Sequence, residues 1–183
     1  MWVFGYGSLV WKVDFPYEKK LTGYIKGYIR RFYQHSIDHR GYPQKPGRVV
    51  TLLLSKNCND KVWGVAYKIK DCDVDKVTKH LDHREKNGYI RSIVKFYPKE
   101  ASEDITKPFD LYIYVATPEN ESFAGEASIQ DIAQQIYTAC GHSGTNKEYI
   151  YNLANAMRDI GPEAYDEHLC TLERAVRSLD YDD

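Results

Sequence analysis

One carboxylate in the chain stands in a setting suited to proton transfer. Glu85 lies in the charged segment His83–Tyr89, just after a predicted helix and just before a predicted strand. A positioned carboxylate whose pKa lies near neutrality takes a proton from a reacting group and returns it, which accelerates such reactions by about 10²–10⁴-fold. The alternative is a solvated, charged helix end, and counting residues alone favours that interpretation. The residue types therefore make Glu85 a candidate general base but do not decide whether it has that role.

A glycine-flanked turn follows the first predicted strand. Its residues are Gly5, Tyr6, Gly7, Ser8 and Leu9. The two glycines let the backbone turn sharply and present consecutive amide groups to an anion or a carbonyl oxygen. The segment is not a P-loop, and it lacks the third glycine of a dinucleotide-binding fingerprint. A plain strand-ending turn is the alternative, and the spacing alone favours it.

Two further groupings have residue types that occur in active sites. Ser8, Asp38 and His39 have the composition of a hydrolase triad, but the chain lacks the G-x-S-x-G turn of α/β-hydrolases. Arg40 and Arg48 bracket a loop rich in proline and glycine. Their guanidinium groups are suited to clamp a carboxylate, or alternatively they keep the loop soluble. Neither alternative is decided by the sequence.

The histidines and cysteines lack the spacing of a metal site. His35 with His39, and His80 with His83, are close in sequence, but neither pair has the glutamate of a zinc-protease motif. A metal-dependent hydrolase that uses His35 and His39 is kept as an alternative. No C-x-x-C pair is present, which favours reduced thiols in a cytosolic protein. The four cysteines are Cys58, Cys72, Cys140 and Cys170.

Strands are expected first along the chain, in segments that are apolar or that alternate aromatic and β-branched residues with polar ones. They are residues 1–6, 21–37, 48–54, 61–69, 90–97 and 109–117. A cluster of polar turn residues at 56–60 separates the third segment from the fourth, so we expect these two to form a hairpin.

Helices are expected mainly after the strands, from capping residues and apolar positions at helical spacing. The expected limits are Asp71 or Asp73 to about Glu85, Ser128 to Gly141, about Thr145 to Asp159, and a last helix after Pro162. Strands early and helices late favour an α+β fold, with the strands in one strongly curved sheet or barrel.

Length and composition indicate a single globular domain over residues 1–183, with a short exposed acidic tail at about 180–183. The 25 Lys and Arg against 26 Asp and Glu leave a formal net charge of −1. This balance gives no reason to expect a nucleic acid or an anionic membrane as partner. No apolar run approaches the roughly 20 residues of a membrane span, and the first residues lack the basic and apolar regions of a signal peptide. Together with the cysteine pattern, these features lead us to expect a cytoplasmic protein.

Tyrosine is unusually frequent, with 16 residues against 6 phenylalanines. Its ring is suited to burial while its hydroxyl needs a partner, so the excess indicates half-buried strand surface or a pocket lined with hydroxyls. Composition does not choose between these. We assign Tyr24, Tyr28, Tyr67 and Tyr97 to packing.

A set of short motifs follows in order along residues 1 to about 155. They are WVFGYGSL with Val10-Trp11, Arg31-Phe32, Asp38-His39-Arg40-Gly41, Pro46-Gly47-Arg48-Val49, Val62 to Tyr67, Arg84-Glu85-Lys86 with Gly88-Tyr89, Phe96-Tyr97, Ile132-Ala133, and Gly144 with Asn146, Glu148 and Tyr149. Together they resemble the ChaC family of glutathione-specific γ-glutamylcyclotransferases. The start at the first strand, without an N-terminal extension, is similar to the shorter, second paralogue of the animal family.

The resemblance implies a small mixed β-barrel flanked by helices, and a reaction that splits glutathione into 5-oxoproline and Cys-Gly. The substrate's own α-amine attacks its γ-carbonyl, so the resemblance implies neither a metal nor another cofactor. It assigns the role of general base and acid to Glu85. The expected substrate-binding residues are Tyr6, Gly7, Ser8, Leu9, Tyr149, Tyr112, Arg40 and Arg48. Tyr112 is chosen by strand position, with Tyr114 as the alternative, and either Arg40 or Arg48 is expected to meet the substrate's glycine carboxylate.

Besides the metal-dependent hydrolase, two alternatives in function stay open at this point. One is a cyclotransferase that acts on other γ-glutamyl peptides or amines. The other is a ligand-binding or interaction module that keeps the barrel but does not catalyse the reaction. With glutathione as the expected small-molecule partner, we expect a monomer or a weak homodimer.

Overall fold

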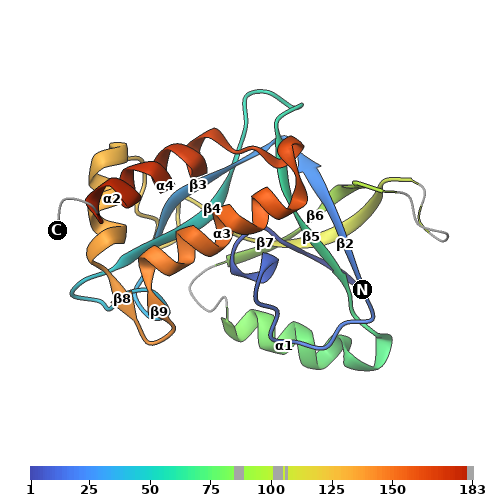
Figure 1. Ribbon diagram of the computed structural model, residues 1–183. Coiled ribbons are helices and arrows are strands. Elements are labelled where there is room, and N and C mark those ends of the chain that lie inside the picture. The colour runs from blue at the N-terminus through green and yellow to red at the C-terminus, as the bar shows by residue number, and fades with distance from the viewer. Residues whose placement is uncertain (85–88, 101–104, 106, 181–183) are drawn as a thin grey trace. The chain divides into compact units, whose positions relative to one another are not determined.

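Five strands close into a barrel in the order β1-β5-β2-β6-β7 in the computed structural model, which describes residues 1–84, 89–100, 105 and 107–180. These strands are β1 (Trp2–Gly5), β2 (Lys19–Lys26), β5 (Lys61–Lys68), β6 (Tyr89–Pro98) and β7 (Phe109–Ala116). Neighbours pair antiparallel except β1 and β7, which pair parallel where Val3 faces Tyr112. Figure 1 shows β2, β5, β6 and β7 side by side. The expected mixed barrel is confirmed.

Large apolar side chains fill the barrel from one face of each strand. Phe4 and Phe96 are almost fully buried, and their ring centroids lie 5.7 Å apart. Glycines on neighbouring strands make room for the two rings. A Cβ atom at Gly64 would lie 2.7 Å from the Phe4 ring, and one at Gly23 would lie 2.5 Å from the Phe96 ring. Such distances are far shorter than normal packing contacts, so this interior requires glycine at both positions.

The segment expected as one strand over 21–37 is two strands, because the chain turns at Gly27. This residue has φ of 79°, a conformation that glycine adopts without strain. It separates β2 from β3 (Tyr28–Ser36), which pairs with β4 (Gly47–Leu54) in a separate two-stranded sheet. The prediction that 48–54 forms a hairpin with 61–69 is therefore wrong. Residues 61–68 instead pair with β1 and β2 in the barrel.

The chain folds into two compact units. The barrel unit comprises residues 1–29 and 52–121, and the helical unit comprises residues 30–51 and 122–183. The expectation of a single domain over 1–183 stays a prediction. Asp180, where the expected tail begins, accepts hydrogen bonds from Lys147 Nζ (2.6 Å) and Tyr151 Oη (2.8 Å). Residues 181–183 lie outside the described chain.

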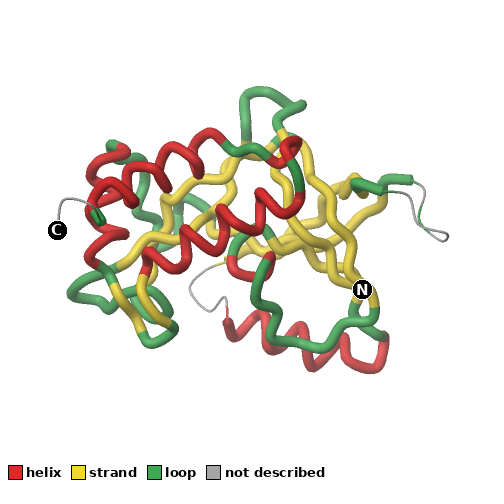
Figure 2. Tube along the Cα trace, viewed as in Figure 1, coloured by secondary structure: helices red, strands yellow, loops and turns green. Residues whose placement is uncertain are grey.

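The helices follow the capping signals of the sequence. In the barrel unit, α1 (Val74–Arg84) comes after a 3₁₀ turn at Asp71–Asp73. The helical unit contains α2 (Ile129–Thr138), α3 (Asn146–Ile160), a 3₁₀ turn at Pro162–Ala164 and α4 (Glu167–Leu179). Ser128, Thr145 and Asp166 each accept a hydrogen bond from a backbone N–H of the first turn and so cap α2, α3 and α4. Figure 2 shows α3 and α4 as neighbouring helices, and the two pack together.

One expected helix end is wrong. The helix α2 stops at Thr138, and Gly141 belongs to the short strand β8 (Cys140–Gly141), which pairs with β9 (Gly144–Thr145). A Cβ atom at Gly141 would clash with the carbonyl oxygen of His39. The glycine is therefore explained by a close backbone approach and not by a helix terminus. The α+β class itself is confirmed. Among the described residues, no helix is long and apolar enough to cross a membrane.

Candidate active site

The glycine-flanked turn after β1 folds back on itself through a short 3₁₀ turn, η1 (Ser8–Val10). The Val10 N–H donates to the carbonyl oxygen of Gly7 (3.0 Å). A Cβ atom at Gly5 would lie only 2.6 Å from Leu9 Cβ, so the fold-back needs glycine there. Within the part of the chain that is described, the amides of Gly7 and Leu9 take no part in backbone hydrogen bonds. These two N–H groups are suited to an acceptor from a ligand.

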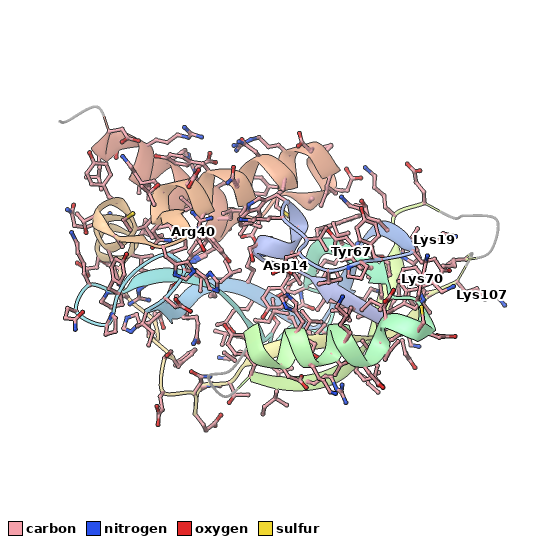
Figure 3. The ribbon with its side chains drawn as sticks, turned by 90° about the horizontal axis from the view of Figure 1, so that it is seen from below. Asp14, Lys19, Arg40, Tyr67, Lys70 and Lys107 are labelled. Atoms are coloured by element: carbon pink, nitrogen blue, oxygen red, sulfur yellow. The ribbon has the colours of Figure 1, made fainter. Side chains whose placement is uncertain are left out.

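Two tyrosine hydroxyls hold this turn from opposite ends. Tyr6 Oη donates to the carbonyl oxygen of Tyr114 on β7 (2.6 Å). Tyr67 Oη, on β5, donates to the carbonyl oxygen of Leu9 (2.6 Å); Tyr67 is labelled in Figure 3. Burial raises the pKa of Tyr67 to about 12, with a further contribution from Tyr17, so its hydroxyl stays protonated and able to donate at neutral pH.

The two tyrosines of β7 differ in their surroundings, although the spacing of two residues puts both on the same face of the strand. Tyr112 is half-buried, and the guanidinium of Arg91 lies over its ring at 5.0 Å from the centroid. Tyr114 is 8% exposed, and its Oη has no hydrogen-bond partner among the described residues. Burial first, and then the charge of Asp82, raises the pKa of Tyr114. Tyr114 therefore carries the more enclosed hydroxyl.

Glu85, the expected general base, lies outside the described residues. In the barrel unit the described chain ends at Arg84, the last residue of α1, and resumes at Tyr89, the first residue of β6. The side chains of His83 and Arg84 are also outside the description. The assignment of Glu85 stays a prediction.

The expected arginine ligand Arg40 belongs to the helical unit and is 7% exposed. Its backbone N–H donates to Ser36 Oγ (2.9 Å). Its Nη1 donates to the carbonyl oxygen of Thr145 (3.0 Å) and to Glu148 Oε2 (3.1 Å) at the start of α3. Arg40, labelled in Figure 3, thus joins the segment after β3 to α3.

Arg48 is held in the same way and is 6% exposed. Its Nε donates to Gln135 Oε1 (2.8 Å), and its Nη1 donates to the carbonyl oxygens of Phe32 (3.1 Å) and Gly125 (2.8 Å). Asn146 pairs with the Arg48 backbone, accepting from its N–H (2.7 Å) and donating to its carbonyl oxygen (2.8 Å). These contacts give both arginines a structural role, and their expected role as substrate ligands stays a prediction.

Tyr149, the other expected pocket tyrosine, lies in α3 and is 5% exposed. Its ring packs edge-on against Phe32, with centroids 6.0 Å apart, and its Oη accepts a long hydrogen bond from the Val50 N–H (3.4 Å). Of the expected site residues that are described, the barrel unit holds Tyr6, Gly7, Ser8, Leu9 and Tyr112, and the helical unit holds Tyr149, Arg40 and Arg48. Within the helical unit, Arg40 and Tyr149 lie together, with the guanidinium 6.0 Å from the ring centroid.

The other groupings found in the sequence have different partners. Asp38 Oδ1 pairs with His142 Nδ1 (2.9 Å), and His39 Nδ1 forms a hydrogen bond with Ser143 Oγ (2.9 Å). Asp38 and His39 are thus each engaged with a residue from the β8–β9 turn. In the described chain, no group of three or more His, Cys, Asp or Glu side chains is arranged to hold a metal ion.

Sequence patterns miss two contributions to the candidate site. They assign Tyr67 to packing, yet it positions Leu9 through its hydroxyl. They give Tyr114 only as the alternative to Tyr112, yet it is the tyrosine whose hydroxyl lacks a partner among the described residues. Strand alternation puts Tyr112 and Tyr114 on the same face and does not separate them. Only their different burial in the structure distinguishes Tyr114 from Tyr112.

Comparisons with known proteins agree with these observations. The family described as ChaC-like protein matches residues 1–179. A human protein named glutathione-specific γ-glutamylcyclotransferase 1 is 44% identical over 182 residues, covering 98% of this chain and 79% of its own length. An Arabidopsis thaliana protein named γ-glutamylcyclotransferase 2-3 is 42% identical, covering 98% of this chain and 89% of its own length.

Solved structures show the same fold. The crystal structure of a yeast γ-glutamylcyclotransferase specific to glutathione aligns with a TM-score of 0.89 and 28% identity, over 97% of this chain and 96% of that one. A further γ-glutamylcyclotransferase structure aligns over 94% of this chain and 85% of its own, with a TM-score of 0.53 and 16% identity, and supports the fold alone.

Proposed function

This chain belongs to the ChaC family, and from that membership we infer that it is a glutathione-specific γ-glutamylcyclotransferase. The observation that carries this inference is 44% identity to a relative of that name over 98% of the chain. The enzyme is a lyase that converts glutathione into 5-oxoproline and Cys-Gly. We place it in the cytosol, a location supported by four cysteines that are all free thiols.

The reaction is a rearrangement within the substrate. The α-amine nitrogen forms a bond to the γ-carbonyl carbon, and the bond from that carbon to the cysteinyl nitrogen breaks. One proton leaves the α-amine and one reaches the departing cysteinyl amine, so no oxidant, reductant or protein nucleophile is consumed. Holding the amine and the carbonyl in attack geometry contributes several kcal/mol, because it converts a flexible chain into a preorganised ring precursor.

We propose Glu85 as the group that moves these protons. A single carboxylate takes the proton from the α-amine and returns one to the leaving amine, provided its pKa is near neutrality. Support comes from its position in the chain, directly after the end of α1 and before the start of β6, both of which belong to the barrel unit that also contains the Gly5–Leu9 turn.

We propose the amides of Gly7 and Leu9 as donors to the oxygen that becomes negatively charged on the γ-carbon. Both N–H groups are absent from the backbone hydrogen bonds of the described residues. The hydroxyls of Tyr6 and Tyr67 hold the turn that carries them. Donors that are fixed before the reaction stabilise developing charge without reorganisation, and removing one such donor costs about 10²–10³-fold in rate.

Product analysis tests this function. Purified protein is incubated with glutathione, and 5-oxoproline and Cys-Gly are quantified by mass spectrometry. We expect both products in equal amounts. A clear preference for γ-glutamyl-alanine over glutathione would support the proposed reaction type but contradict the proposed specificity for glutathione. Binding of glutathione without turnover would identify a non-catalytic module.

The role of Glu85 is tested by Glu85→Gln, which removes the proton-accepting group but keeps the size of the side chain. We expect turnover to fall by at least about 10²-fold while the thermal midpoint of unfolding stays unchanged. Glu18→Gln is the matched control, because Glu18 is an exposed carboxylate paired with Lys68 on the barrel surface. Full activity in Glu85→Gln would remove Glu85 from the mechanism.

A further inference from the structure

Tyr114 has a buried hydroxyl that the described chain leaves without a hydrogen-bond partner. The residue is 8% exposed, and its Oη is shielded from solvent. A buried hydroxyl without a partner destabilises a fold by about 1–3 kcal/mol, so such groups are rare in native proteins and require an explanation.

The backbone of Tyr114 is bonded to the proposed substrate-binding turn, and two charged residues act on its hydroxyl. Its carbonyl oxygen accepts the hydrogen bond from Tyr6, which ties this point of β7 to the Gly5–Leu9 turn. Across the β6–β7 pair, Tyr114 lies opposite Arg91. Burial and then Asp82, from α1, raise the pKa of its hydroxyl, whereas Arg91 lowers it, and the net effect keeps the phenol protonated at neutral pH. Asp82 and Arg91 thus lie near the hydroxyl, but neither meets hydrogen-bond geometry with Oη. The group is therefore a neutral donor on a residue whose backbone is bonded to the turn that is proposed to bind the substrate.

The hydroxyl of Tyr6 is less suited to this task. It has one proton, and that proton is used in the 2.6 Å hydrogen bond to the carbonyl oxygen of Tyr114. Tyr112 is on the same strand face, but its ring lies under Arg91 and it is only half-buried. Tyr114 is the tyrosine of this group whose donor has no acceptor among the described residues.

We propose that the Tyr114 hydroxyl donates a hydrogen bond to an oxygen of the γ-glutamyl group of the bound substrate. The proposal rests on the proposed function. Glutathione offers only acceptor oxygens in its carboxylates and carbonyls, which complement a donor that has no acceptor at hydrogen-bond geometry among the described residues. Substrate must displace the groups that cover Oη, and the resulting bond is strong because water does not compete for it.

Tyr114→Phe tests the proposal, since it removes one oxygen atom and leaves the ring in place. We expect kcat/KM for glutathione to fall by about 10–100-fold, the range for a hydrogen bond to a charged or developing-charge acceptor. The thermal midpoint should stay the same or rise, because the variant loses a buried hydroxyl that has no hydrogen-bond partner within the described chain. A hydroxyl with a purely structural role would lower the midpoint instead.

Tyr97→Phe is the matched control, because Tyr97 is a barrel tyrosine whose ring stacks on Tyr24 at 5.2 Å. Its activity should equal that of the wild-type protein. Tyr112→Phe tests the alternative that the Tyr112 hydroxyl, and not that of Tyr114, binds the substrate. The proposal is overturned if Tyr114→Phe keeps wild-type kcat/KM, if Tyr112→Phe carries the loss instead, or if Tyr114→Phe lowers the thermal midpoint more than Tyr97→Phe does.

Failure of the inference is distinguishable from failure of the proposed function. A wild-type protein that does not convert glutathione refutes the proposed function. A wild-type protein that converts glutathione, together with a fully active Tyr114→Phe variant, refutes only the role of Tyr114.

Discussion

Tyr67 Oη lies 2.6 Å from the carbonyl oxygen of Leu9, a residue 58 positions earlier in the chain. This hydrogen bond fixes the far end of the Gly5–Leu9 turn to the end of β5, while Tyr6 fixes its near end to Tyr114 on β7. The turn carries the amides proposed to bind the substrate, so the geometry of these amides depends on the two tyrosine hydroxyls.

Tyr67→Phe is expected to impair both stability and turnover. Loss of the bond leaves the Leu9 carbonyl without its donor, which costs about 1–2 kcal/mol in the free energy of unfolding. The turn also loses its fixed shape, so we expect kcat to fall by about tenfold with a smaller change in KM. Urea unfolding and steady-state kinetics with glutathione measure the two effects.

The control for this variant is Tyr17→Phe, which alters a ring that packs against Tyr67 with centroids 5.0 Å apart but leaves the hydrogen bond intact. Tyr17→Phe should behave as the wild type. If Tyr67→Phe loses stability but keeps full kcat, the hydroxyl supports the fold without shaping the turn.

Arg48→Lys is expected to destabilise the protein and leave substrate affinity unchanged. The guanidinium donates to three acceptors, on Gln135, Phe32 and Gly125, that a single ammonium group does not reach together. We expect a loss of about 2–4 kcal/mol in the free energy of unfolding, since buried acceptors are left unsatisfied. Arg174→Lys, at an exposed position of α4, should have no measurable effect. A large rise in KM with unchanged stability would instead support Arg48 as a substrate ligand.

His168 is expected to make the protein sensitive to acid. Its Nε2 accepts a hydrogen bond from the Phe32 N–H (3.1 Å), and burial, followed by the charge of Arg31, lowers its pKa from 6.5 to about 4. Between these values the unfolded chain binds a proton that the folded chain does not. The stabilisation is therefore complete above about pH 6.5 and is lost as the pH falls to about 4, an effect of roughly 2–3 kcal/mol.

His168→Gln tests this dependence, because its amide oxygen accepts the same hydrogen bond but does not titrate. The free energy of unfolding, measured by denaturant at pH 4 to 7, should vary less steeply with pH in the variant than in the wild type. His80→Gln is the control, since His80 is an exposed residue paired with Asp14. Equal slopes in wild type and His168→Gln would contradict the assignment.

The local elements of this protein are readable from its amino-acid sequence alone. Ser128, Thr145 and the residues after Pro162 mark helix starts, and the expected limits of β6 and β7 lie within two residues of the observed ones, because caps and side-chain alternation are encoded in neighbouring residues. The motifs also point to the ChaC family, since they depend on residue identity and order rather than on geometry.

The partners of these residues depend on the tertiary structure. It pairs β4 with β3 instead of β5. It directs the N–H groups of Arg48 to backbone carbonyl oxygens and to the side chain of Gln135, and it buries Tyr114 more deeply than Tyr112. A hydrogen-bond donor can bind any acceptor oxygen within about 3 Å. Which oxygen comes that close depends on segments that are remote in the chain. The residue type therefore determines which interactions a side chain is able to make. The fold determines whether its hydrogen-bond partner is another part of the protein or a ligand.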